Sequence, residues 1–539
     1  MRCFFTHPRT KQNLDLFLPV RYDEYMFGKG FIKTYLSGMI RAAVVAVLVL
    51  LQFALVFFMA VRLARYGLLL YIFVDIICII AVIRIVNDRA SNSFKLGWMV
   101  IIAVLPIAGL IMYLLWGRPE GTKKIRLRHM SYIINSKKFN TPDPAAFEHF
   151  TGDFREYRGL AGLAKNYGFP VTEGSALRYF ESGETAFETM IEDIEKAEKF
   201  IFMNFFIVAD GILWQRIKPL LLAKAAAGVE IRFSYDDFGS MLRTDDQFWS
   251  ELEEAGIKTA RFNRITRYLN KLYMNYRNHQ KIVVIDGNIG YTGGFNLADE
   301  YVNAIERFGH WKDGGIRIEG PGVWGLTTTF IGMWDMTVHE METDVDRYRP
   351  TVNPKVEHSY CQIISDGPEN NPDNPIYDTI TAFCAEANDF LYISTPYLVI
   401  EDSLGDTLIR AAKSGVDVRL ITPGIPDKRL VNLLTKYNYG RLLEGGVRIY
   451  EYTPGFIHIK NLITRDCGII GTINLDYRSL FLHYECGAMV WNREFIEEAE
   501  EDFLRTFECS REISYEEWKK RPTWDKLRQW FLNLFASEV

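Results

Sequence analysis

The strongest constraint on the fold is that the body of the chain repeats itself. Residues 227–232 and 414–419 have the same pattern of small, apolar and charged residues, 187 positions apart. Gly256-Ile257 and Gly446-Val447 repeat at a similar offset of 190. In each copy a helical period alternates with a strand-like one, as in sheets flanked by helices. We therefore expect an α/β fold of two pseudo-symmetric α/β/α halves, residues 176–350 and 351–510, with a central cleft between them.

The segment before this body is apolar and predicts a membrane anchor over residues 42–117. Residues 42–61 and 96–116 are uncharged runs long enough to cross a bilayer as helices. The run between them, residues 68–83, contains Asp75, so two or three transmembrane helices are expected. The alternative is a set of buried core helices. A basic tail, residues 1–41, precedes the anchor, and a linker, residues 118–175, follows it.

Basic residues lie on both sides of the anchor, so the charges leave its orientation open. Basic residues follow the last apolar run at once, which favours a cytoplasmic catalytic part of a multi-pass protein in the cell membrane. They are Arg118, Lys123, Lys124, Arg126 and Arg128. The seven cysteines form no CxxC pair, which fits reduced thiols and argues against a zinc site or a disulfide framework. A net charge of -5 argues against a nucleic-acid partner.

Each half carries the same polar constellation near its end. The first has His279, Lys281 and Asp286, followed by Asn296 in a Gly-Gly-Phe-Asn segment. The second has His458 and Lys460, followed by Asn474 in a Gly-Thr-Ile-Asn segment. On a strand, a histidine and a lysine two positions apart share one face. A histidine can attack phosphorus or move a proton near neutral pH, and a lysine can neutralise phosphate oxygens.

The structural alternative is a buried histidine beside a lysine that reaches solvent, which is the better interpretation of a single such pair. Two matching pairs in a duplicated context favour chemistry instead. The asparagines can donate hydrogen bonds to the same phosphate oxygens, so Asn296 and Asn474 are candidate phosphate-binding residues.

These paired motifs resemble the HKD signatures of the phospholipase D superfamily. The surrounding sequence is similar to bacterial cardiolipin synthases, and the similarity runs from the anchor nearly to the C-terminus. The segments that carry it are residues 235–240, 275–279, 395–397, 452–458 and 471–479.

The resemblance implies transfer of a phosphatidyl group between two phosphatidylglycerol molecules, giving cardiolipin and glycerol without a metal or other cofactor. By analogy with the family, His279 is the nucleophile that forms a phosphohistidine, and His458 is the acid and base. The catalytic set is then His279, Lys281, Asp286, His458, Lys460 and Asp466. The residues alone do not order the two histidines, because the motifs are pseudo-symmetric. Oligomeric state is open.

Two positions depart from the family pattern. The second motif has Arg465 where an acid is expected, with Asp466 one place later, and its hairpin is one residue shorter than the first. Asn204 stands where relatives commonly have Glu. A phospholipase D-type hydrolase of anionic phospholipid and a catalytically weak lipid-binding paralogue therefore remain alternatives.

Two surface segments fit an anionic phospholipid and a membrane as partners. Residues 258–285 hold seven basic residues and no acid, with tyrosines between the basic residues. The alternative is that these basic residues pair with acids elsewhere. The C-terminal segment, residues 511–539, contains an amphipathic helix whose apolar face either lies at the membrane interface or docks on the body.

Overall fold

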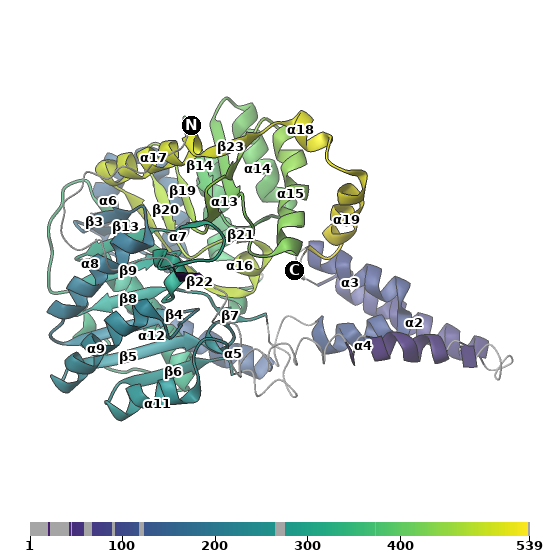
Figure 1. The fold of residues 1–539 in the computed structure, drawn as a ribbon, viewed down its shortest axis with the longest axis horizontal. Coiled ribbons are helices and arrows are strands. Elements are labelled where there is room, and N and C mark those ends of the chain that lie inside the picture. Colours follow the sequence, from purple (N-terminus) through teal and green to yellow (C-terminus); the bar gives the residue numbers. More distant parts are fainter. Residues whose placement is uncertain are drawn as a thin grey trace.

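The computed structural model describes residues 20–21, 43–44, 46–55, 57–58, 67–88, 92–117, 123–264, 275–371 and 373–536. Two mixed β-sheets form its body, one from each half of the repeat (Figure 1). The first sheet has the strand order β3 (Ala176–Phe180), β12 (Gly315–Glu319), β9 (Ile289–Gly293), β8 (Ile282–Ile285), β4 (Phe200–Phe205), β5 (Glu230–Asp236) and β6 (Lys258–Phe262).

The second sheet repeats this order and adds a short strand at each end. Its order is β2 (Thr172–Glu173), β13 (Tyr360–Asp366), β22 (His483–Trp491), β20 (Gly468–Gly471), β19 (Asn461–Ile463), β14 (Phe390–Ser394), β16 (Asp417–Pro423), β17 (Arg448–Tyr452) and β23 (Ser510–Ile513). In each sheet three neighbouring strands are parallel: β4, β5 and β6 in the first, and β14, β16 and β17 in the second. The first strand after each motif lysine, β8 or β19, pairs antiparallel with β4 or β14. The duplication seen in the sequence is thus a duplication of sheet topology.

The sequence explains the buried position of the central strands. All six residues of β4 and all five of β14 are buried, as continuous apolar runs in parallel strands require. The crossover helices of the first half are α8 (Gly183–Lys196), α9 (Ile212–Ala226) and α11 (Asp246–Glu254), beside the short α10 (Asp237–Ser240). Their counterparts are α13 (Pro375–Glu386), α14 (Asp402–Lys413) and α15 (Arg429–Glu444).

Two further helices lie between the sheets. Helix α12 (Val323–Val338) contacts β13 of the second sheet, and α17 (Arg493–Glu508) contacts β3 of the first. One hydrophobic cluster takes side chains from both helices and both sheets, including Phe202, Phe330, Ile463 and Phe503. The halves therefore share a core, and their relative position is fixed by packing.

Short strands also tie each half to the other. Strand β7 (Arg277–Asn278) pairs in parallel with β22, and β11 (His310–Lys312) pairs in parallel with β18 (Gly455–Ile457). The other short pairs are β15 (Leu398–Val399) with β21 (Leu475–Asp476) and β1 (Val20–Arg21) with β10 (Ile305–Glu306). Short helical segments complete the loops: η3 (Arg155–Tyr157), η5 (Asp299–Val302), η6 (Asp346–Tyr348), η7 (Pro368–Asn370) and α16 (Tyr477–Phe481).

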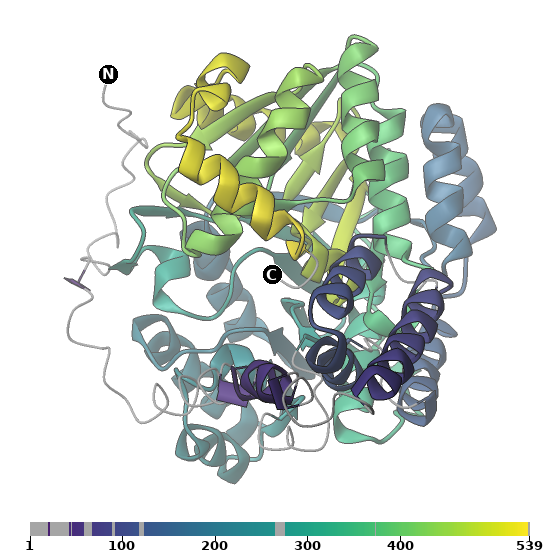
Figure 2. The same cartoon turned by 90° about the vertical axis from the view of Figure 1, so that its right-hand side faces the viewer.

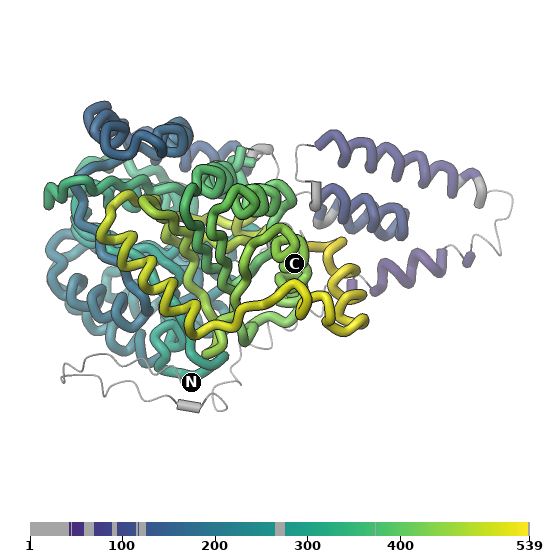
Figure 3. Tube along the Cα trace, turned by 90° about the horizontal axis from the view of Figure 1, so that it is seen from above, coloured from purple at the N-terminus to yellow at the C-terminus, as the bar shows by residue number. Residues whose placement is uncertain are grey.

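The N-terminal helices extend away from this body (Figure 3). They are α2 (Gly67–Val86), α3 (Asn92–Val104) and α4 (Pro106–Trp116), which pack together around Cys78, Ile85, Trp98 and Ile102. The uncharged run over 96–116, expected as one helix, is two helices. The break falls at Pro106, which has no N–H to continue a helix and begins α4.

The first uncharged run is described only in part. Within it, the Gln52 side chain accepts a hydrogen bond from the Ala108 N–H at 2.8 Å, next to the start of α4. Within the described ranges, we find no helix that combines the length and the apolar character needed to cross a membrane. The predicted transmembrane anchor over residues 42–117 is therefore not confirmed.

Linker and C-terminal helices pack on the body. The linker contains α5 (Lys123–Lys137), α6 (Pro144–Asp153) and α7 (Arg158–Asn166), of which α5 lies along α12. At the other end, α18 (Tyr515–Lys519) and α19 (Thr523–Asn533) contact α15. Figure 2 shows α19 crossing the second half close to the N-terminal helices. The predicted C-terminal amphipathic helix is α19, and the short α18 precedes it, with Pro522 between the two.

Candidate active site

The two motif histidines lie where the halves cross. His279 directly follows β7, and its backbone N–H donates to the Tyr484 carbonyl of the second half at 3.0 Å. His458 directly follows β18, and its N–H donates to the Lys312 carbonyl of the first half at 2.7 Å. Each histidine is therefore held by a strand of the other half.

A carboxylate of the opposite half orients each imidazole. His279 Nδ1 lies 2.8 Å from Glu485 Oε1, and His458 Nδ1 lies 2.7 Å from Asp313 Oδ2. An ionised carboxylate accepts from Nδ1–H, which leaves Nε2 unprotonated and free to attack or to take a proton. Both side-chain pairs are almost completely buried. The site thus contains two histidine–carboxylate dyads, each shared between the halves.

Sequence reasoning missed Glu485 and Asp313. The sequence did contain a signal, because Asp313 lies just before strand β12 and Glu485 lies inside strand β22. Both acids are buried in the structure. A buried acid inside a sheet costs free energy unless it is paired, so such positions mark candidate partners. The pairing across halves, however, depends on strand register that the sequence does not contain.

The motif lysines join the dyads. Lys281 Nζ donates to the His279 carbonyl at 2.5 Å, and Lys460 Nζ donates to the His458 carbonyl. Burial lowers the pKa of Lys281 to about 8 and that of Lys460 to about 7, against the attraction of Glu485 and Asp313. Burial is also the main reason that the pKa of His279 lies well below its usual value, with Lys281 and Lys460 adding to the effect.

These electrostatic effects show that the four residues share one site. Burial, followed by the charge of Lys460, lowers the pKa of His458 to about 4. The paired histidine lowers the pKa of Asp313, although burial opposes this. Both imidazoles are therefore neutral at pH 7, whereas Lys281 is mostly charged and Lys460 is charged in part.

The two asparagines lie in the site with different partners. Asn296 Oδ1 accepts from the Ile207 N–H at 2.9 Å, and its Nδ2 donates to the Tyr301 hydroxyl at 2.7 Å. Asn474 donates its backbone N–H to Ser479 Oγ, and its buried Oδ1 has no hydrogen-bond partner among the described residues. The Asn296 amide is therefore already engaged, and Asn474 is the less constrained of the two.

The motif aspartates do not meet the histidines. Asp286 lies at the far end of β8, where its carboxylate accepts from the N–H groups of Glu198, Lys199 and Phe200 at 2.7–2.8 Å. Its positive φ of 54° forms the turn into β9. These contacts are with backbone groups at the start of β4, so the structure does not bring Asp286 together with the motif histidines.

The second hairpin closes in another way. Thr464 N–H donates to the Cys467 carbonyl at 2.8 Å, and the Tyr157 hydroxyl of the linker bonds Thr464 Oγ1 at 3.1 Å. Arg465 is exposed and pairs with exposed Asp389 at 3.3 Å. Partial burial raises the pKa of Asp466, whose carboxylate makes no hydrogen bond to the part of the chain that is described. Asp466 lies on this turn, and the charged groups that act on its carboxylate are Glu156, Arg465, Arg493 and Asp389, not the motif histidines or lysines.

Asn204, the other departure, belongs to a neutral network. Its side chain exchanges hydrogen bonds with Asn278 at 2.7 and 3.3 Å, and its Nδ2 also reaches Gln280 Oε1 at 3.3 Å. Asn278 and Gln280 flank His279. The amide network therefore holds the first motif from behind without adding charge to it.

The basic segment is largely neutralised where it is described. Lys258 pairs with Glu230, Arg261 with Asp237 and Arg277 with Asp236. Residues 265–274, which hold the rest of its basic residues apart from Arg264 and Lys281, lie outside the described residues. The described part thus follows the alternative of pairing with acids.

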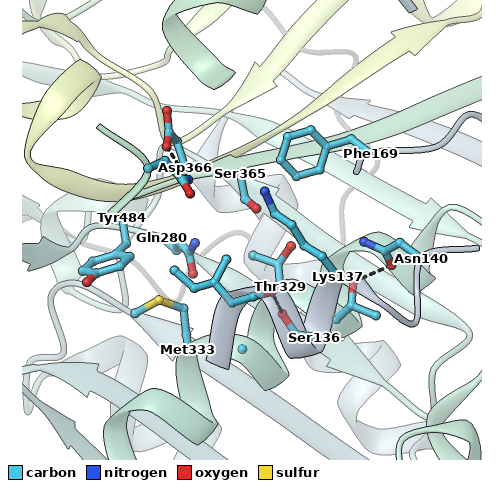
Figure 4. Close-up of a pocket in the computed structure, with 14 residues that line it drawn as sticks. Ser136, Lys137, Asn140, Phe169, Gln280, Thr329, Met333, Ser365, Asp366 and Tyr484 are labelled. Atoms are coloured by element: carbon cyan, nitrogen blue, oxygen red, sulfur yellow. Dashed lines mark hydrogen bonds between the residues drawn. The ribbon is translucent and has the colours of Figure 1, made fainter. Parts of the chain in front are cut away.

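A small cavity of about 30 Å³ lies behind the first motif (Figure 4). Lys137 of α5 and Asp366 of β13 face it, together with Gln280 and Tyr484. Burial lowers the pKa of Lys137 and raises that of Asp366 to about 7. The Tyr484 hydroxyl donates to Glu369, which also bonds His129 of α5 at 2.9 Å. The linker helix therefore supports the strand that carries Glu485.

Among the described residues, one group has ligand atoms close enough to hold a metal ion: His279, His483 and Glu485. Two of these already form a hydrogen bond with each other, and Lys281 carries a positive charge against the same carboxylate. His279 and Glu485 of this group thus serve as the first dyad.

Comparison with known proteins agrees with this geometry. Residues 190–306 and 380–507 match a family described as "Cardiolipin synthase, PLD-like domain", and residues 73–118 match "Phospholipase_D-nuclease N-terminal". A cardiolipin synthase of Listeria monocytogenes is 31% identical over 86% of this chain and 98% of its own length. The major cardiolipin synthase ClsA of Bacillus subtilis is 31% identical over 86% and 97%.

An uncharacterized protein of Streptococcus mutans is 35% identical over 80% of this chain and 94% of its own. Among solved structures, phosphatidylserine synthase of Haemophilus influenzae has a similar fold. Its TM-score is 0.54 at 14% identity, covering 70% of this chain and 97% of that one.

Proposed function

This chain belongs to the bacterial cardiolipin synthase family of the phospholipase D superfamily, and on that basis we propose that it transfers a phosphatidyl group from one phosphatidylglycerol to another. The products are cardiolipin and free glycerol. The observation that carries the proposal is the convergence of two histidine–carboxylate dyads and two buried lysines on one site.

In the first step His279 Nε2 attacks the phosphorus of the donor lipid, and the phosphorus–oxygen bond to glycerol breaks. His458 gives its proton to that oxygen, and Lys281 and Lys460 balance the charge on the phosphoryl oxygens. Both imidazoles are neutral at pH 7, so His458 must gain a proton when substrate binds. The negative charge of a phosphodiester held beside the lysines raises the pKa of His458, which takes this proton from solvent, while His279 stays neutral and attacks.

In the second step the terminal hydroxyl of another phosphatidylglycerol loses its proton to His458 and attacks the phosphohistidine. The His279–phosphorus bond breaks, and the phosphodiester of cardiolipin forms. Glu485 and Asp313 remain ionised throughout and stabilise whichever imidazole carries positive charge. The assignment of His279 as the nucleophile rests on the family analogy, because the two dyads are pseudo-symmetric.

Membrane association is part of the proposal, with the catalytic body on the cytoplasmic side. Large apolar side chains are exposed on α2, among them Leu69, Phe73 and Ile80. Helix α19 exposes Trp524, Leu527, Trp530 and Phe531, and it lies close to the N-terminal helices in two views (Figures 1 and 2). Exposed apolar surface of this extent marks a contact with lipid or another apolar partner.

The test is incubation of the purified chain with phosphatidylglycerol in mixed micelles, with a chelator present, and product analysis by mass spectrometry. Cardiolipin and glycerol in equal amounts are expected. Phosphatidic acid without cardiolipin would instead identify a hydrolase that uses water as acceptor. Lipid binding without any product would identify a silent paralogue.

A further inference from the structure

The two dyads occupy equivalent positions in their strand pairs. The same register identifies one further residue beside each dyad. In the β7–β22 pair, Tyr484 lies opposite Asn278, the residue before His279. In the β11–β18 pair, Lys312 lies opposite Ile457, the residue before His458. Glu485 and Asp313 are the next residues along. The residues two places before the carboxylates, His483 and Trp311, are therefore equivalent.

These two residues place an aromatic ring against their histidines in the same way. The rings of His483 and His279 have centroids 5.4 Å apart and planes inclined at 41°. The rings of Trp311 and His458 have centroids 5.4 Å apart and planes inclined at 42°. An imidazole in one half thus takes the position that an indole has in the other.

Each of these rings also points a nitrogen at the dyad carboxylate. Trp311 Nε1 lies 3.4 Å from Asp313 Oδ2, and His483 Nδ1 lies 3.6 Å from Glu485 Oε1. His483 Nδ1 is buried and has no hydrogen-bond partner within the described ranges. A shift of a few tenths of an ångström would bring it to hydrogen-bond distance of the carboxylate that orients His279.

The charges around His483 make it a neutral donor. The groups that face it are Glu485 on its own strand, His279 and Arg478 of α16. Burial dominates and lowers its pKa to about 3. At neutral pH the ring is uncharged and, like an indole, can offer one N–H to the carboxylate.

We propose that His483 is a positioning residue of the first dyad, whose Nδ1–H and ring hold Glu485 and His279 in line as Trp311 holds Asp313 and His458. Its effect on turnover rests on the proposed function, whereas its effect on the protonation of His279 does not.

The consequence for His279 follows from the donors to Glu485. Ser479 Oγ donates to Glu485 Oε1 at 2.5 Å, and Thr472 Oγ1 donates to Oε2. Loss of the His483 N–H makes the carboxylate a stronger base and loosens the ring contact. Both changes raise the pKa of His279 and let its imidazole turn.

The test compares His483→Phe, which keeps a ring without an N–H, with His483→Trp, which copies the other half, and His483→Asn, which keeps an N–H without a ring. His149→Phe, at an exposed histidine on α6, is the control. The full chain is assayed for cardiolipin formation against pH, and the histidine ring nitrogens are titrated by NMR with ¹⁵N-histidine labelling.

We expect His483→Phe to lower kcat about tenfold with KM nearly unchanged, and to move the acidic limb of the pH profile upward by roughly half a unit or more. His483→Trp and His483→Asn should recover most of kcat, and His149→Phe should match the parent. A parental kcat and His279 titration in His483→Phe would overturn the inference. So would a tenfold loss in all three His483 variants with an unshifted profile.

If His483→Phe does not fold, as judged by its melting temperature, the Trp and Asn variants decide. A large loss in both would then refute the proposal, and near-parental activity in both would support it. The NMR readout separates the two claims. A parent that forms no cardiolipin while the His279 titration still shifts in the variants would reject the proposed function and retain the role of His483.

Discussion

The hairpin that follows each motif lysine is built differently in the two halves. In the first, Asp286 accepts three backbone N–H groups and fixes the turn at the start of β4. In the second, the turn is shorter, Thr464 and Cys467 close it, and Tyr157 of the linker covers it. Both hairpins nevertheless deliver a buried lysine and histidine to the same site. The comparison teaches that the acid of the motif anchors a turn, and that another closure can replace it.

The dyads differ around the carboxylates as well. Gly294 has no side chain, and a Cβ there would lie 2.0 Å from Asp313 Oδ1. The equivalent residue of the second half is Thr472, which instead donates its hydroxyl to Glu485. Both halves pair a histidine with an acid, but the residues that surround each acid differ.

The largest effect should follow removal of a histidine. His279→Ala or His458→Ala should lower kcat by roughly 10⁴-fold or more, because each step needs one imidazole as nucleophile and the other for proton transfer. Initial-rate measurements of cardiolipin formation test this. Substantial turnover in His458→Ala would contradict the two-histidine mechanism and break the equivalence of the halves.

Neutralising a dyad acid should cost slightly less. Asp313→Asn and Glu485→Gln should each lower kcat by about 10³-fold or more, since the amide stabilises neither the imidazolium nor the correct tautomer. Glu319→Gln, at a half-buried acid of β12, is the matched control and should leave the rate unchanged. A loss in only one of the dyad variants would show that the halves are unequal in chemistry.

Adding a methyl group at Gly294 should displace Asp313. We expect Gly294→Ala to lower kcat about 100-fold, as a shift of about 1 Å in a reacting group does. Thr472→Ala should lower it less, because Glu485 keeps Ser479 as a donor. A nearly parental Gly294→Ala would mean that the first-half carboxylate tolerates displacement.

The lysines predict an alkaline loss of activity. Activity needs the charged form of both, and the pKa values of about 7 for Lys460 and about 8 for Lys281 place the loss of charge at these pH values. As pH rises through this range, kcat/KM should fall, while substrate binding shifts the fall in kcat to higher pH. Profiles of both constants measure the shift, and identical limbs would contradict it.

The smallest effect on turnover should come from the motif aspartates. Asp286→Ala should lower the free energy of unfolding by about 3 kcal/mol through loss of three charge-assisted hydrogen bonds, with kcat reduced only a few-fold. Asp466→Ala should change both quantities little. Denaturant unfolding tests the difference, and equal losses of stability would show that Asp466 anchors its turn after all.

The sequence predicted the features that depend on local pattern. The duplicated α/β halves, both His-x-Lys pairs and the apolar N-terminal region follow from periodicity and spacing; the fold bears out the duplication and brings the two His-x-Lys pairs into one site. The carboxylates at 313 and 485 could not be derived, because they reach the histidines through pairing between strands far apart in the chain. The single helix over 96–116 was wrong because that expectation rested on hydropathy alone and gave no weight to Pro106, which has no N–H to continue a helix.

The exchange of strands between halves has a consequence for how such a protein can arise. Each half carries one histidine and the acid that serves the other, so neither half contains a complete pair. An ancestor with a single half would have been inactive as a monomer and competent only as a symmetric dimer. Joining two such halves in one chain keeps them permanent neighbours and lets each differ from the other, as the rings at 311 and 483 and the turns at 286 and 466 do.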